Sequence, residues 1–187
     1  MPHLDQATTA ETAHITIHQH SDKEEAIAYA RRHGVAVLEG RGRVEKFHGD
    51  LVPGATPFEV VESPPNLFLT AGITALWNLV AGLGGTAFGS TAYLGVGDST
   101  TAATAAQTDL QAATNKVRFA VAAAPVVSTN QCTWSGTANT STANFAWQEA
   151  GVFTASSGGT MLNRLVTSFG TKTSSASWTL SLTLSIS

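Results

Sequence analysis

The chain of 187 residues has few charged side chains and a single cysteine. Charged residues make up 12% of it, against about 25% in an average soluble protein, and the formal net charge is −3. A charge this small creates no strong field for nucleic acid or an anionic membrane, so we expect neither as a partner. With Cys132 alone, no disulfide can form within the chain. No neighbour would stabilise its thiolate, which predicts a small apolar filler.

Long apolar runs and a signal peptide are also missing. The longest apolar stretch, residues 67–83, is interrupted by polar residues and glycines and is too mixed to span a membrane. The first six residues lack the basic and apolar regions of a signal peptide, which predicts synthesis in a cytoplasm without export. The length fits one domain, with or without a small appendage, that buries a core without disulfides or metal.

Charge is distributed unevenly along the chain. Residues 1–66 hold ten of the 13 acidic residues, six of the ten basic residues and all six histidines. Residues 67–187 are rich in Ala, Ser, Thr and Gly instead, and prolines cluster just before them. This change in composition predicts a boundary after residue 66. We therefore expect an attachment region at 1–66 and a separate domain at 67–187.

The N-terminal region has the pattern of an arm followed by a small strand–helix–strand unit. Residues 2–12 are polar and patternless, which predicts an arm that a partner orders. Residues 14–18 alternate like a strand, and 23–33 have the composition of a capped helix that Gly34 ends. Residues 35–38 complete the unit as a short apolar strand.

Residues 41–66 have the composition of an extended segment with prolines and scattered apolar side chains. Extended arms bind neighbouring proteins through main-chain pairing and small apolar anchors. We therefore predict that this segment binds a partner, and that deleting residues 1–66 leaves a folded domain without the attachment. The predicted partner-binding residues are Phe47, Leu51, Phe58, Val60 and Val61.

The second region has the pattern of a β-sandwich. A helix-like run through Ile73, Leu76, Trp77 and Val80 places apolar residues on one face. Short strands separated by turn residues follow, which predicts a mainly-β, jelly-roll-like sandwich with one N-proximal helix. The four tryptophans lie in apolar-patterned segments, so packing in the core is favoured over a sugar-binding surface. The expected strands are 92–96, 117–122, 132–135, 143–148, 162–168 and 178–187.

The expected last strand alternates without a break: from Trp178 to Ser187, every even position is apolar and every odd position is Ser or Thr. One face of such a strand is apolar and the other hydroxylated. Burying Leu180, Leu182, Leu184 and Ile186 is worth about 1.5–3 kcal/mol each. An unpaired apolar edge invites aggregation, so we expect this strand inside its sheet or paired across a subunit boundary.

The sequence predicts no catalytic residues and no cofactor. Residues 67–187 contain no histidine, and their three carboxylates, Asp98, Asp109 and Glu149, are scattered. The glycine-rich residues 82–87 follow a helix and precede a strand, the reverse of a dinucleotide-binding turn.

Three N-terminal histidines are weak candidates for a metal site. His14, His18 and His20 would share one face of the predicted strand, where imidazoles can bind zinc or nickel. Histidines hydrogen-bonded on a solvated or interface face are the simpler interpretation, so no metal is predicted.

Several segments of the second region resemble structural proteins of tailed-bacteriophage virions. They are LFLTAGITALW (67–77), AYLGVGDSTTA (92–102), QTDLQA (107–112), NFAWQEAGVF (144–153) and GTMLNR (159–164). This pattern is similar to capsid-surface, collar and tail-fibre modules, and residues 1–66 have no part in it.

The resemblance implies a non-catalytic virion protein assembled in the host cytoplasm. The leading expectation is a capsid decoration or cement protein that binds the major capsid protein and stabilises the shell. The alternatives are a tail, collar, baseplate or fibre component and, from another class, a carbohydrate-binding host-recognition module. By analogy with such proteins, a homo-oligomer is expected, with a trimer as the model.

Overall fold

The computed structural model describes residues 29–30, 32–34 and 36–186. Residues 37–187 form one compact unit and residues 1–36 another. In the latter, Tyr29, Ala30 and Arg32 are helical, and Gly34 follows with a φ of 65°. This agrees with the last turn and the glycine stop of the predicted helix. The predicted arm at 2–12, the strand at 14–18, and His14, His18 and His20 lie outside the described residues.

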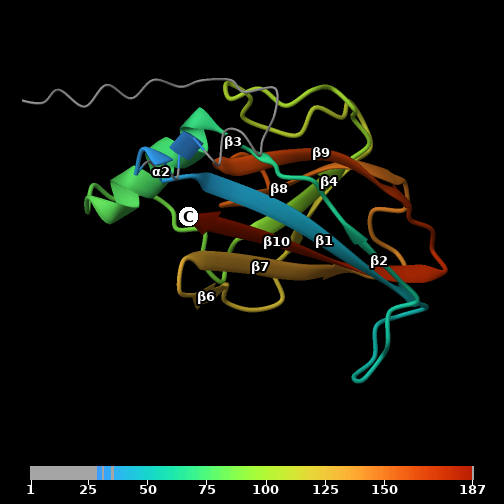
Figure 1. The fold of residues 1–187 in the computed structure, drawn as a ribbon. Coiled ribbons are helices and arrows are strands. Elements are labelled where there is room, and N and C mark those ends of the chain that lie inside the picture. The colour runs from blue at the N-terminus through green and yellow to red at the C-terminus, as the bar shows by residue number, and fades with distance from the viewer. Residues whose placement is uncertain (1–28, 31, 35, 187) are drawn as a thin grey trace, which may run out of the picture. The chain divides into compact units, whose positions relative to one another are not determined.

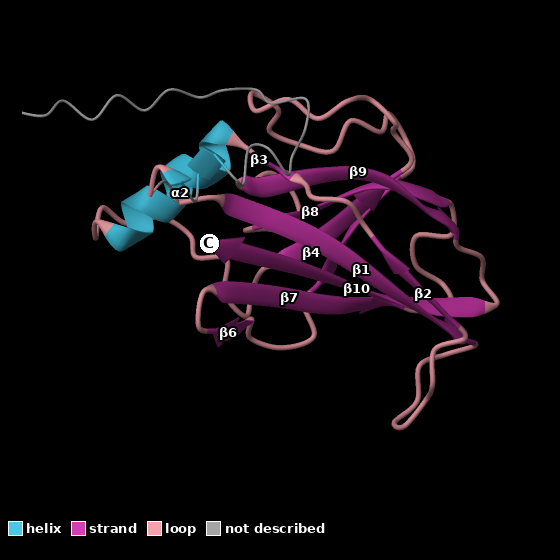
Figure 2. Cartoon of the chain, in the orientation of Figure 1, coloured by secondary structure: helices cyan, strands magenta, loops and turns pink. Residues whose placement is uncertain are grey.

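The larger unit consists of two antiparallel sheets of five strands each, with one helix early in the chain (Figures 1 and 2). This confirms the predicted mainly-β sandwich. The first sheet has the order β2-β1-β10-β7-β6 and the second the order β3-β9-β8-β4-β5. The elements are β1 (Leu38–His48), β2 (Glu59–Glu62), β3 (Leu67–Phe68), α2 (Thr70–Val80), β4 (Tyr93–Gly97), β5 (Lys116–Ala120), β6 (Val126–Ser128), β7 (Gln131–Ala138), β8 (Ala146–Phe153), β9 (Met161–Thr171) and β10 (Ala176–Ile186).

Strand β10 lies at the centre of its sheet, between β1 and β7. Its leucines at 180, 182 and 184 are buried, while hydroxyls line the opposite face. There, Thr179 and Thr183 share hydrogen bonds with Thr137 (2.9 Å) and Thr133 (2.8 Å) on β7. Cross-strand pairs of this kind stabilise a sheet. The alternating pattern therefore predicted the place of this strand correctly, except that Ile186 is half-exposed.

The boundary expected after residue 66 differs from the structure, because β1 and β2 belong to the sandwich. All eleven residues of β1 pair with β10, from Leu38 opposite Ile186 to His48 opposite Ala176. Deleting residues 1–66 would therefore remove a neighbour of the central strand and expose its edge. Residues 41–66 are extended, as predicted, but as part of a sheet and its connections rather than as an arm.

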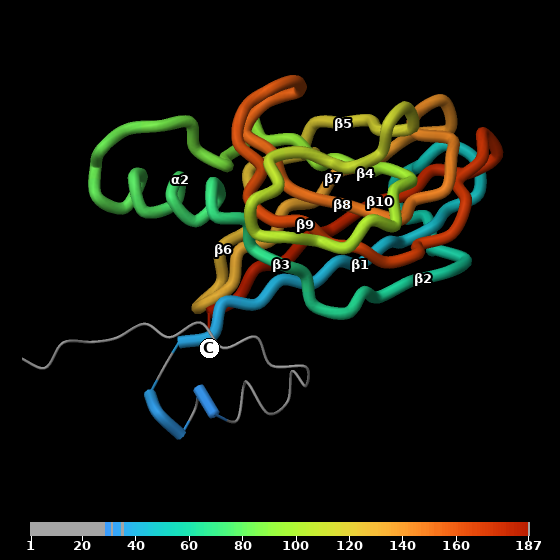
Figure 3. Tube along the Cα trace, turned by 90° about the horizontal axis from the view of Figure 1, so that it is seen from above, coloured from blue at the N-terminus to red at the C-terminus, as the bar shows by residue number. Residues whose placement is uncertain are grey.

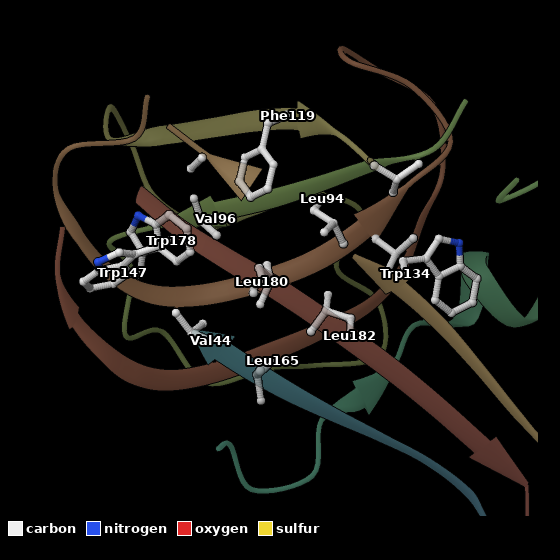
Figure 4. Packing of buried hydrophobic residues seen from close by; sticks show 14 of the residues in the cluster. Val44, Leu94, Val96, Phe119, Trp134, Trp147, Leu165, Trp178, Leu180 and Leu182 are labelled. Carbon is white, nitrogen blue, oxygen red and sulfur yellow. The ribbon is translucent and has the colours of Figure 1, made fainter. Parts of the chain in front are cut away.

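The core lies between the two sheets and contains three of the four tryptophans. Figure 4 shows Trp147 and Trp178 side by side near one end of the core and Trp134 near the other. The indole rings of Trp147 and Trp178 meet edge to face, with centroids 5.0 Å apart. Core packing is thus confirmed for these three. It is wrong for Trp77, which is 66% exposed, because α2 extends outward from the end of the sandwich (Figure 3).

Candidate functional site

The described residues form an apolar groove at the end of the sandwich where α2 lies. It lies between α2, the β6–β7 turn and the ends of β1 and β10, and has a volume of about 390 Å³. None of its lining residues is charged. We call it the end groove. Its lining includes Leu38, Leu76, Leu79, Val127, Cys132 and Ile186.

Close packing of helix α2 on β9 sets one wall of the end groove. Gly72 is the buried residue of the helix, and a Cβ atom there would lie 2.3 Å from the carbonyl oxygen of Leu162 and 2.6 Å from its Cα. Only glycine allows the two backbones to approach this closely. Ile73 and Leu76 pack against the core, whereas Trp77 and Val80 are exposed. The helix therefore packs on the sandwich through Gly72, Ile73 and Leu76, and Leu76 and Leu79 also line the groove.

We expect Gly72→Ala to destabilise the protein by about 1–3 kcal/mol, the usual cost of overpacking. In an exposed helix the same change would stabilise by roughly 1 kcal/mol, so the sign of the effect reports the contact with Leu162. Gly89→Ala is the matched control, since a Cβ there meets nothing within 4 Å. The measurement is the urea dependence of unfolding. Equal stability of the two variants would contradict the tight contact.

The opposite wall of the end groove is the two-residue turn that joins β6 to β7. Asn130 fixes this turn to β10 by two hydrogen bonds. Its side-chain amide donates to the main-chain carbonyl of Ile186, and its main-chain carbonyl accepts from the main-chain amide of Ile186. Cys132 lies half-buried in the groove, and burial raises the pKa of its thiol. A protonated thiol is a poor nucleophile, which agrees with the predicted role as a small apolar filler.

Three large exposed apolar side chains line the end groove. Leu38, Val127 and Ile186 are 37%, 73% and 53% exposed, and Val80 and Leu83 at the end of α2 are each 77% exposed. Single exposed apolar residues are ordinary, but a group of them around an uncharged hollow is typical of an interaction surface. The geometry suits the binding of an apolar segment rather than chemistry on a polar substrate.

A second notable feature is a buried ion pair between two neighbouring strands of the second sheet. Glu149 on β8 and Arg164 on β9 are both inaccessible, and the Nη2 of Arg164 lies 2.7 Å from the Oε2 of Glu149. Arg164 also donates to the carbonyl of Thr101 (2.9 Å) and to Oε1 of Gln107 (3.0 Å). The Glu149 carboxylate accepts the amides of residues 111 and 112 at 2.9 and 2.8 Å. The pair thus holds the long β4–β5 connection, residues 98–115, against the sheet.

This network joins several of the motif segments in the second region. Glu149, Arg164, Thr101 and Gln107 come from four of the five segments on which the expected resemblance is based. Gly97 belongs to the same pattern, because a Cβ at this position would lie 2.4 Å from Oε1 of Glu149. Residues of these motif segments therefore anchor a long loop to the sheet.

Asp109 anchors the far end of the same connection. Its carboxylate lies 2.8 Å from Arg118 and 3.2 Å from Lys116, and also accepts the amide of Leu110. Partial burial raises the pKa of Asp109, but these hydrogen bonds outweigh it and hold the pKa below its usual value of 3.8. The third carboxylate, Asp98, accepts a hydrogen bond from Asn115. Each scattered carboxylate thus has its own structural partner.

The five predicted partner-binding residues do not form one surface. Phe47 is buried, and Val61 is half-buried against the core. Leu51, Phe58 and Val60 are exposed, but they do not line the end groove. The prediction did not identify the groove, because its walls come from segments far apart in the sequence. The one local sequence feature that points to the groove is the pair of valines at 126 and 127, just before the turn at Thr129 and Asn130.

Among the described residues, no three His, Cys, Asp or Glu side chains are grouped so that they could hold a metal ion. In the same part of the chain, no helix has the length and apolar character needed to cross a bilayer. Comparisons with models of protein families, with curated proteins and with solved structures gave no match.

Proposed function

We propose that this chain is a non-catalytic structural protein of a tailed-bacteriophage virion. In this proposal it is a capsid decoration protein that binds the major capsid protein and stabilises the shell. The observation that carries the binding role is the end groove, an uncharged hollow lined in part by exposed apolar side chains. The sequence resemblance supports the virion setting. A homo-oligomer, by analogy a trimer, belongs to the same proposal.

The end groove would receive an apolar segment of the capsid protein. An extended segment placing alternate apolar side chains into the hollow could also pair with edge strand β6, whose three residues are exposed. The many copies in a shell would multiply a modest affinity at each site. Stabilisation of the shell then follows from mass action, because a ligand that binds only the assembled state favours assembly.

Val127→Asp tests the proposal in the full-length chain. This residue is 73% exposed, so we expect the variant to fold, but a carboxylate in the groove would lose its solvent when a partner binds. Binding to shells that lack this chain should therefore weaken at least about tenfold. The matched control is Val52→Asp, in the β1–β2 connection and 59% exposed. Co-sedimentation with shells measures both variants.

The sole cysteine supplies an independent readout of the same experiment. Cys132 lines the end groove, so bound shells should slow its alkylation in the wild-type protein. Equal binding by the two aspartate variants, or unchanged alkylation in the presence of shells, would contradict the role of the groove. A chain found only on the tail or collar of purified particles, at a much lower copy number than the shell protein, would favour the alternative location.

A further inference from the structure

A second, chemically different recess lies where the β1–β2 connection meets the β9–β10 turn. In the register of β1 against β10 this is the end opposite the groove, since His48 pairs with Ala176 while Leu38 pairs with Ile186. The recess has a volume of about 370 Å³, within the range of roughly 300–1,000 Å³ that is usual for small-molecule sites. We call it the hairpin recess, and its walls contain aromatic, charged and hydroxyl side chains.

Main-chain hydrogen bonds hold the two sides of the hairpin recess together. Gly49, with a φ of 64°, donates its amide to the carbonyl of Ser175 (2.8 Å), and its own carbonyl accepts from the hydroxyl of Ser177 (2.7 Å). On the other side, the amide of Phe58 donates to the carbonyl of Lys46 (2.9 Å). The recess is therefore largely preformed rather than assembled by a flexible loop.

One wall of the hairpin recess is an aromatic platform. The rings of His48 and Phe58 stack with their centroids 4.3 Å apart and an interplanar angle of 18°. Both side chains are exposed, and Phe58 is 49% exposed. A half-exposed aromatic ring held in place by a stacking neighbour offers a flat apolar face at little entropic cost. Such a face suits a ligand that has a patch of C–H groups.

The other walls present hydrogen-bonding groups without a net charge. Nζ of Lys46 lies 2.9 Å from the carboxylate of Glu59 and 4.4 Å from the ring centroid of Trp178. The ammonium and the carboxylate compensate each other, so the recess offers a donor and an acceptor but does not select an ion. Thr173 and Ser175 add two hydroxyls that bond to each other at 2.8 Å, and Thr171 also lines the recess.

We propose that the hairpin recess binds a neutral saccharide unit. A pyranose ring combines an apolar C–H face with a rim of hydroxyls, which matches a platform of Phe58 and His48 beside the Lys46–Glu59 pair. The Glu59 carboxylate would repel an anion. A purely apolar ligand would bury the charged pair without giving it hydrogen bonds. This inference does not rest on the proposed virion role, and it places sugar binding on Phe58 rather than on the buried tryptophans.

An oligosaccharide array probed with the full-length protein tests the proposal, and the best oligosaccharide is then titrated by ligand-observed NMR. We expect Phe58→Ala to weaken binding at least about tenfold and Glu59→Gln to weaken it less. Val60→Ala, a neighbouring exposed residue that does not line the recess, should bind like the wild type. Unchanged thermal unfolding of the three variants separates loss of the site from loss of the fold.

Two outcomes overturn the proposal. One is an array on which no neutral oligosaccharide binds the wild-type protein. The other is binding that Phe58→Ala and Glu59→Gln leave unchanged, which would place the sugar elsewhere on the molecule. Neither outcome affects the end groove, because Val127 and Cys132 belong to the other end of the sandwich.

Discussion

Replacing Arg164 with Met is expected to lower the free energy of unfolding by about 3–5 kcal/mol, because the variant leaves a buried carboxylate without its charged partner. Glu149 is fully buried, so water cannot replace the guanidinium. The same change removes the two hydrogen bonds from Arg164 to Thr101 and Gln107. We therefore expect the β4–β5 connection to become susceptible to proteolysis as well. Urea unfolding and limited proteolysis measure the two effects.

Two comparisons separate the buried pair from ordinary surface charge. Arg41→Met removes an ion pair to Glu39 in which the arginine is 62% exposed, and we expect a change below about 1 kcal/mol. The double variant Glu149→Met, Arg164→Met removes both charges and should recover part of the loss. Recovery stays partial, because the amides of Gln111 and Ala112 lose their acceptor. A loss below 1 kcal/mol for Arg164→Met would mean that the pair is hydrated in solution.

Leu182→Ala is expected to destabilise the protein by about 2–5 kcal/mol. Leu182 is fully buried on the central strand of its sheet and belongs to the main core cluster. Its loss leaves a cavity between two sheets that pairing on both sides of β10 prevents from closing. Chemical unfolding followed by tryptophan fluorescence provides the measurement.

Ser181→Ala, one residue earlier on β10, is the control for this cavity. Its hydroxyl faces away from the core and bonds to that of Ser135 at 3.1 Å, so we expect a loss of about 1 kcal/mol or less. Similar losses of unfolding free energy in the two variants would contradict the larger contribution to stability that the packing assigns to the inward face of β10.

The sequence predicted β10 and missed β1, although the two strands pair along their whole length. In β10, apolar residues mark the inward positions. In β1 the inward positions are Gly40, Gly42, Val44 and Lys46, which hydropathy does not identify as a core face. Space explains the glycines, since a Cβ at Gly42 would lie 2.7 Å from the Leu165 side chain. Lys46 is buried because its ammonium has both the Trp178 ring and Glu59 as partners.

The candidate sites were harder to predict than the fold. Phe58 was predicted as a short apolar anchor for a partner, but its neighbours in the recess, such as Thr173 and Ser175, come from the β9–β10 turn. The end groove likewise joins α2 to the β6–β7 turn and to Ile186. Only sheet register and helix packing bring such segments together.

The end groove and the hairpin recess lie at opposite ends of the paired strands β1 and β10. Leu38 at the groove and His48 at the recess are the first and last residues of β1, roughly 32–34 Å apart along the strand. A partner seated at one end therefore leaves the other unobstructed. On a regular lattice of partners, the outward ends would be displayed at a fixed spacing. A polymeric ligand could then bind several copies at once, with a higher affinity than it has for one copy.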